Sequence, residues 1–304
     1  MNLVFAIVAP GQGAQKQGFL APWLELDGFA SALAALSEDV DLAHFGTQAD
    51  DDTIRDTAIA QPLLVGAALA VAQVLGETAD VVAGHSVGEL AATALAGIVS
   101  PQEAMRLVNV RGRAMAAASA VQPTSMTAII GGKVDEVLAA LEAAGLTAAN
   151  NNGSGQIVAA GTIAQLEALT ANPPARARLI PLSVAGAFHT VHMAPAVDAL
   201  REAAATITPQ SPTTRLLSNR DGAVVTDGSD ALDRLVNQVA NPVRWDLCMA
   251  TLAELGVTGL LELTPAGTLT GIAKRNLKGV ELFNLNTPDQ LDDARAFAAA
   301  QRKA

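Results

Sequence analysis

The chain of 304 residues has one cysteine, Cys248, no tyrosine and only two tryptophans. A single cysteine excludes an internal disulfide and suits a reducing compartment, so we expect a cytoplasmic protein. Apolar runs are interrupted before the roughly eighteen residues that a membrane span needs. The first apolar run, MNLVFAIVAP, has no Lys or Arg ahead of it and no cleavage site, so it indicates a buried strand rather than a signal peptide. We expect no membrane partner.

Positive charge is also scarce. The formal net charge is −11, which makes a broad phosphate-binding surface and a nucleic-acid partner unexpected. One basic cluster stands out, formed by Lys274, Arg275 and Lys278. It fits either the solvated end of a helix or a landing patch for an acidic partner or a phosphate. The sequence leaves these two interpretations open.

Strand-like and helical segments alternate along most of the chain, which predicts an α/β fold with a largely parallel sheet. Residues 57–75 indicate a long helix with a break near Pro62. Residues 125–183 follow the order βαββαβ, which is the ferredoxin-like arrangement. We therefore predict an α/β-hydrolase-like large domain (residues 1–124 and 189–304) with a parallel-sheet core and an inserted ferredoxin-like small domain (residues 125–188).

The sequence GHSVG at residues 84–88 fits the G-x-S-x-G elbow, in which a strand turns sharply into a helix and presents a serine. Gly84 and Gly88 stand where side chains would collide with backbone. The following helix directs its free amides and positive end toward any oxyanion formed beside Ser86. Ser86 is therefore the best nucleophile candidate, although an ordinary turn serine also fits five residues.

A serine hydroxyl needs a base, and the chain has four histidines. His44 lies in a polar loop and His85 is fixed beside the serine, which leaves His189 and His192 after the small domain. We expect one of them to be the base, and the helix-starting position of His192 favours His189. The acids between Ser86 and His189 lie on predicted helices, mostly solvent-facing, so a Ser-His dyad oriented by a backbone carbonyl or an amide is at least as well supported as a triad.

Arg111 lies in the apolar stripe of the helix predicted for residues 101–118. At about 100° per residue, Ala104, Val108, Arg111 and Met115 share one face, whereas Arg106 and Arg113 lie opposite. A buried guanidinium requires an anion, so Arg111 should meet either a structural carboxylate or that of a substrate. The loop APGQGAQ at residues 9–15 lacks the spacing and the acid of a dinucleotide fingerprint, and its amides suit the second donor of an oxyanion hole.

Together these residues resemble the malonyl-CoA:acyl carrier protein transacylases of fatty acid and polyketide synthesis. The resemblance covers nearly the whole chain, and its motifs stand in the family's order. They are PGQGAQ (residues 10–15), QP (61–62), GHSVGE (84–89), VRGRAM (110–115), NNGSGQIV (151–158), AFH (187–189), NQVANPVRW (237–245) and LTGIAKR (269–275).

The resemblance implies a role for each matching position. Ser86 would be the nucleophile and His189 the base, oriented by the backbone carbonyl of Gln238. The amides of Gln12 and Val87 would form the oxyanion hole. Arg111 would bind the malonyl carboxylate and Asn152 would line the cleft. Phe188, directly before the histidine, matches the residue found there in the malonyl-selective members of the family. Three departures are Val87 where leucine is commoner, Ser154 where proline is commoner, and ELTPAG at residues 262–267 in place of E-x-G-P-G.

The implied reaction is ping-pong transfer of malonyl from malonyl-CoA, through an ester of Ser86, to the phosphopantetheine thiol of acyl carrier protein. It needs no metal or other cofactor. A buried arginine should reject acetyl by roughly 10⁴, whereas one extra methyl in methylmalonyl is worth only about 1 to 3 kcal/mol. Two alternatives use the same fold: a serine esterase or thioesterase with the same dyad and no role for Arg111, and a non-catalytic scaffold.

Overall fold

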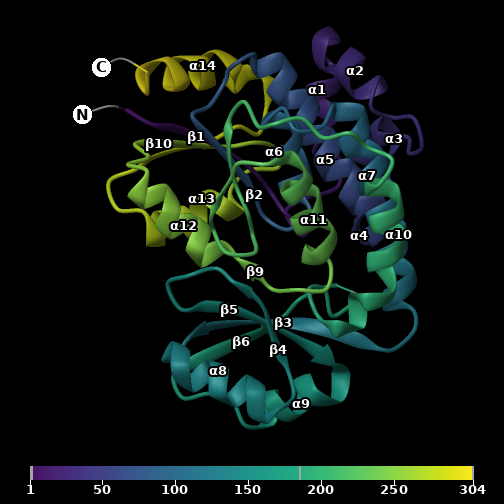
Figure 1. Cartoon of the computed structure of the whole chain (residues 1–304), viewed down its shortest axis with the longest axis vertical. Helices are drawn as coiled ribbons and strands as arrows, with labels where there is room; N and C mark the ends of the chain where they lie inside the picture. Colours follow the sequence, from purple (N-terminus) through teal and green to yellow (C-terminus); the bar gives the residue numbers. More distant parts are fainter. Residues whose placement is uncertain (1–2, 185, 303–304) are drawn as a thin grey trace.

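A computed structural model describes residues 3–184 and 186–302, so residues 1, 2, 185, 303 and 304 of the predicted domains lie outside the described residues. The larger part of the molecule is built on a sheet with the strand order β11-β10-β1-β2-β7-β8 (Figure 1). The first five strands are parallel, and β8 is antiparallel to β7. The strands are β1 (Phe5–Ala9), β2 (Val81–Gly84), β7 (Arg215–Leu217), β8 (Val224–Val225), β10 (Gly259–Glu262) and β11 (Glu281–Asn284).

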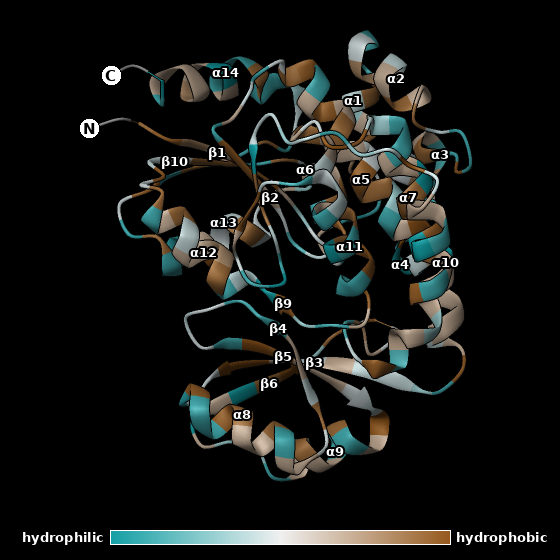
Figure 2. Cartoon of the chain, viewed as in Figure 1, coloured by the Kyte–Doolittle hydropathy of each residue, from teal (hydrophilic) through white to brown (hydrophobic). Residues whose placement is uncertain are grey.

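Helices cover both faces of this sheet, which explains why its central strands are apolar throughout (Figure 2). In β1, Phe5 and Ile7 pack into one core and Ala6 and Val8 into the other, because successive side chains of a strand point to opposite faces. The first core is closed by α2 (Asp27–Ala34), α5 (Thr57–Leu75), α6 (Gly88–Leu95), α7 (Pro101–Ser119), α10 (Ala194–Ala204), α11 (Gly228–Gln238) and α14 (Leu291–Ala300), and the second by α12 (Trp245–Glu254) and α13 (Thr268–Asn276).

Short helices fill the connections. They are α1 (Ala21–Leu24), α3 (Leu42–Thr47), α4 (Asp51–Arg55) and the 3-10 helices η1 (Val191–Met193) and η2 (Pro288–Gln290). A capping box formed by Ser100 and Glu103 begins α7, where the side chain of each residue accepts a hydrogen bond from the backbone N–H of the other. The hairpin of β7 and β8 turns at Gly222, whose φ of 70° suits glycine.

The predicted break near Pro62 is wrong, because α5 continues through that proline. Most of the helix is buried, and this tertiary packing outweighs the one backbone hydrogen bond that proline removes. By length and composition α5 could cross a membrane, yet 78% of its most apolar window is buried inside the protein. That burial is typical of a core helix.

The second sheet has the order β6-β3-β5-β4-β9 and confirms the ferredoxin-like order βαββαβ. Its elements are β3 (Thr124–Gly131), α8 (Val134–Ala143), β4 (Thr147–Asn151), β5 (Gln156–Thr162), α9 (Ile163–Ala171) and β6 (Ala177–Pro181), and β9 (Val243–Arg244) is added from the large domain, parallel to β4. Helices α8 and α9 cover the face that points away from the larger sheet (Figure 1). The overall fold class is confirmed, and the residue limits of the two domains stay a prediction.

Candidate active site

The turn between β2 and α6 holds Ser86 in a conformation that the two flanking glycines make possible. Ser86 has φ of 53°, in the left-handed region that non-glycine residues seldom adopt. A Cβ on Gly84 would lie 2.0 Å from the Gly88 carbonyl group, and a Cβ on Gly88 would lie 2.3 Å from the Ala9 carbonyl oxygen. The backbone N–H of Ser86 donates to the Asn219 side chain at 2.8 Å. The elbow therefore requires both glycines. Asn219, which lies in the loop after β7, holds the elbow through its hydrogen bond with Ser86.

His189 lies against Ser86, with 2.7 Å between the serine Oγ and the imidazole Nε2. The other ring nitrogen, Nδ1, lies 2.7 Å from the Gln238 carbonyl oxygen. A carbonyl only accepts, so Nδ1 carries the proton and Nε2 presents its lone pair to the serine hydroxyl. Burial, and next the charge of Arg111, lower the pKa of His189 to about 3. The imidazole is therefore neutral and ready to accept a proton. His192, the other histidine that the sequence left open, lies in η1 and does not line the cavity beside Ser86.

The predicted stripe on α7 is confirmed, because Arg111 is 2% exposed while Arg106 and Arg113 have 60% and 58% of their side chains exposed. The guanidinium donates to the amide oxygens of Gln61 (2.7 Å) and Gln238 (2.8 Å). Its Nη2 lies 3.5 Å from the Ser86 Oγ. Within the part of the chain that the structure describes, no carboxylate lies within 4.0 Å of Arg111. Burial lowers the pKa of Arg111 to about 10, so it remains charged at neutral pH.

A buried polar network behind the dyad was not found from the sequence. Glu89 was expected to be one of the mostly solvent-facing acids, but it is 2% exposed. It accepts hydrogen bonds from the Asn219 backbone N–H (2.9 Å) and from the Gln238 side-chain amide (2.5 Å). The available signal was its position three residues after Ser86, on the first turn of α6. The sequence also did not predict that Asn219 contacts Ser86 or that Gln61 contacts Arg111. No local pattern marks Asn219 as a site residue.

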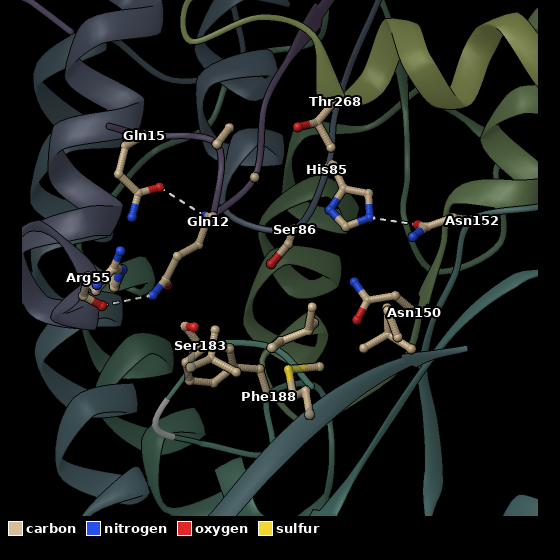
Figure 3. A pocket seen from close by; sticks show the side chains of 18 of the residues that line it. Gln12, Gln15, Arg55, His85, Ser86, Asn150, Asn152, Ser183, Phe188 and Thr268 are labelled. Carbon is tan, nitrogen blue, oxygen red and sulfur yellow. Dashed lines mark hydrogen bonds between the residues drawn. The ribbon is translucent and has the colours of Figure 1, made fainter. Parts of the chain in front are cut away.

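The resemblance predicts that the backbone amides of Gln12 and Val87 form the oxyanion hole. Val87 is the N-cap residue of α6, next to Ser86, and is 1% exposed, and Gln12 lies in the loop after β1, which is parallel to β2. Among the described residues neither amide donates to a protein group. The Gln12 side chain reaches toward Arg55 and Thr57 and forms one wall of the cavity (Figure 3).

A cavity of about 680 Å³ opens above Ser86 between the two sheets. His85, next to the serine, hydrogen-bonds the Asn152 side chain at 2.9 Å on the wall opposite Gln12 (Figure 3). Phe188 and apolar side chains of the small sheet close the side near β3. The cavity thus has polar residues beside Ser86 and an apolar floor. Other residues that line it are Gln61, Met126, Val158, Leu182, Leu269 and Ile272.

The basic cluster lies on exposed surface at the carboxyl end of α13, whose first turns line the cavity. Arg275 donates to the side chain of Gln156, which also lines the cavity, at 2.8 Å. Ser154, at one of the three departures, donates to the Arg275 carbonyl and the Asn276 side chain and so joins the small domain to this helix end. Lys274 and Lys278 are exposed.

Among the described residues, the elbow serine pairs with a neutral histidine and lies beside a buried arginine that has no carboxylate partner. This arrangement is typical of serine-dependent enzymes that transfer acyl groups. The family model for the acyl transferase domain matches residues 6–303. The chain is 51% identical to the malonyl CoA-acyl carrier protein transacylase of Mycobacterium tuberculosis over 95% of this chain and 99% of that protein.

Solved structures agree. The crystal structure of MCAT from Mycobacterium tuberculosis has a TM-score of 0.92 and covers 96% of this chain and 99% of its own, at 51% identity. A malonyl-transacylase solved in complex with a type II PKS acyl-carrier protein has a TM-score of 0.90 at 30% identity, over 96% of this chain and 99% of its own. The chain belongs to the malonyl-CoA:acyl carrier protein transacylases of the acyl transferase family.

Proposed function

We propose that this protein transfers malonyl from malonyl-CoA to the phosphopantetheine thiol of acyl carrier protein. His189 Nε2 takes the proton of the Ser86 hydroxyl as Oγ attacks the thioester carbonyl. The tetrahedral intermediate collapses, the C–S bond breaks, and the proton passes to the sulfur of departing CoA. The thiol of the carrier then gives its proton to His189, attacks the Ser86 ester, and the proton returns to Oγ.

The Gln12 and Val87 amides are proposed to bind the oxyanion, since Gln12 lines the same cavity as Ser86, Val87 follows the serine in the chain, and neither amide donates to a group of the described protein. The Gln238 carbonyl takes the place of a triad acid: it fixes the Nδ1 proton of His189 and accepts a stronger hydrogen bond when the ring becomes charged. Asn152 and Phe188 are proposed to line the path of the acyl group and the pantetheine arm.

The observation that carries the proposal is Arg111, a buried cation that among the described residues is held by the amide oxygens of Gln61 and Gln238, with its Nη2 3.5 Å from the Ser86 Oγ. The charge of Glu89 acts on Arg111 across the Gln238 side chain without direct contact, so within the described chain the guanidinium still lacks an anion paired directly with it, which is costly in a buried position. The free carboxylate of a malonyl ester on Ser86 would be such an anion. A serine esterase or thioesterase with the same dyad has no use for this arginine.

We also propose that the exposed cluster of Lys274, Arg275 and Lys278 is where the acidic carrier protein docks. It adjoins the cavity through Gln156 and α13, so a pantetheine arm entering there would point toward Ser86. On a protein of net charge −11 a local basic patch gives orientation to an acidic partner. The single buried cysteine, Cys248, suits the cytoplasm, which we propose as the location.

The intact mass of the protein after mixing with malonyl-CoA tests the reaction. We expect a malonyl-sized adduct on the wild type, none on Ser86→Ala, and loss of the adduct when acyl carrier protein is added. Absence of the wild-type adduct refutes the proposal. Loss of the adduct to water at the same rate with and without the carrier favours the esterase alternative.

A further inference from the structure

The reaction as described makes no use of Glu89, although this carboxylate is buried on the first turn of α6 directly behind the dyad. Its two oxygens have different partners. Oε1 accepts from the backbone N–H of Asn219, and Oε2 accepts from the side-chain amide of Gln238. An ionised carboxylate only accepts hydrogen bonds, so it suits both contacts at once.

Each of those partners leads to a different functional group. The Asn219 side chain accepts from the Ser86 N–H at 2.8 Å and donates to the Gly84 carbonyl at 2.8 Å, so it holds the elbow on both sides of the serine. The Gln238 side chain faces Glu89 with its nitrogen and Arg111 with its oxygen. Its backbone carbonyl, by contrast, faces His189.

The direction of the Gln238 amide decides what Arg111 meets. If the amide turned over, its NH₂ group would face the guanidinium, which has only donors, and its oxygen would face both Glu89 and the Ser86 carbonyl. Glu89 therefore selects the orientation that keeps an acceptor at Arg111. His189 is less dependent on this choice, because it is held by the main chain.

We propose that Glu89 is a positioning residue that acts through Gln238 and Asn219 to hold Arg111 and the Ser86 elbow in place for a malonyl group. This inference rests on the proposed function. Protonated Glu89 has a donor where an acceptor is needed, so the anionic form is the working one. Burial raises the pKa of Glu89 to about 7, against the hydrogen bonds from Asn219 and Gln238 and the charge of Arg111. The titratable or charged groups that face it are Arg111 from α7 and the Cys248 thiol from α12, and His189 lies beyond Gln238.

The test compares malonyl-CoA with acetyl-CoA as donors to Ser86, by rates of adduct formation between pH 5.5 and 8.5. In the wild type we expect the malonyl-to-acetyl ratio to fall as the pH decreases through about 7. His189, with a pKa of about 3, stays neutral over this range, and its protonation would slow both donors equally and leave the ratio constant. A wild-type ratio that does not change over this range overturns the inference, and this measurement depends on no variant folding.

Glu89→Gln keeps the shape but must place an NH₂ group against either Asn219 or Gln238. We expect kcat/KM for malonyl to fall by about 10- to 100-fold, the effect of one mispaired buried group, and the ratio to become independent of pH. The matched control is Glu262→Gln, another fully buried glutamate, which accepts from backbone amides at the start of α13. The control should lose thermal stability but keep the pH-dependent ratio. A Glu89→Gln protein with the wild-type pH dependence overturns the inference, whereas a wild type that forms no malonyl adduct overturns the proposed function itself.

Discussion

Replacing Arg111 with alanine should change which acyl group the protein accepts rather than whether Ser86 reacts. The guanidinium touches the Ser86 Oγ at 3.5 Å but does not hold His189, which is fixed by the Gln238 carbonyl at 2.7 Å. Removing one partner of a buried charge pair costs about 3 to 5 kcal/mol. Since each 1.4 kcal/mol is about tenfold, malonyl transfer should fall by about 10²- to 10⁴-fold.

Acetyl should be accepted better by the Arg111→Ala protein, because acetyl no longer leaves a buried cation unpaired. The assay is the kcat/KM for malonyl-CoA and acetyl-CoA with each protein. Arg106→Ala is the matched control, since Arg106 lies on the same helix with 60% of its side chain exposed and should keep the wild-type preference. Thermal unfolding of each variant checks that the fold persists, since the oxygens of Gln61 and Gln238 lose a donor. An unchanged malonyl preference in Arg111→Ala would refute the reasoning.

Three further predictions concern the elbow, the base and the carrier. Gly84→Ala should abolish adduct formation, because its Cβ would lie 2.0 Å from the Gly88 carbonyl group, and a variant with normal labelling would show that the turn is not tight. His189 has a folded pKa of about 3, below its ordinary 6.5, so the unfolded state binds more protons between these values and the folded state loses stability as the pH falls below about 6.5. Relative to wild type, His189→Gln should therefore gain up to about 3 kcal/mol between pH 6.5 and pH 4.5, measured by denaturant unfolding, and an unchanged difference contradicts a neutral buried imidazole. Charge reversal at Lys274 and Lys278 should raise the KM for acyl carrier protein but not for malonyl-CoA, and an unchanged carrier KM would remove the docking proposal.

The sequence predicted local features well where the backbone conformation or the helical position requires a particular residue type. The glycines of GHSVG and the stripe that contains Arg111 follow from backbone sterics and helical periodicity, and both are present in the structure. The break near Pro62 failed for the opposite reason. The unfavourable helix propensity of one proline costs less free energy than the packing of the buried helix α5 contributes, so the helix continues.

Long-range contacts were beyond local patterns. Nothing near Asn219 in the chain indicates that its side chain contacts Ser86, which lies 133 positions earlier. Likewise, no local pattern indicates that β9 pairs with β4 of the small sheet. The burial of Glu89 depends on what packs over the first turn of α6, which periodicity does not specify. Such contacts depend on how the sheet order brings chain segments together, and a single sequence carries no record of those pairings.

By itself the sequence determined that the chain is an α/β protein with an inserted small domain, an elbow serine and a buried arginine, because strands, helices and tight turns leave periodic and steric marks on neighbouring residues. Local patterns left His189 and His192 open and the family resemblance implied His189, which the tertiary structure places against Ser86. Only the tertiary structure decided that, among the described residues, amide oxygens rather than a carboxylate hold Arg111. It also decided that Glu89 lies behind both groups. These are distances between residues far apart in the chain, and only the folded packing of both domains fixes them.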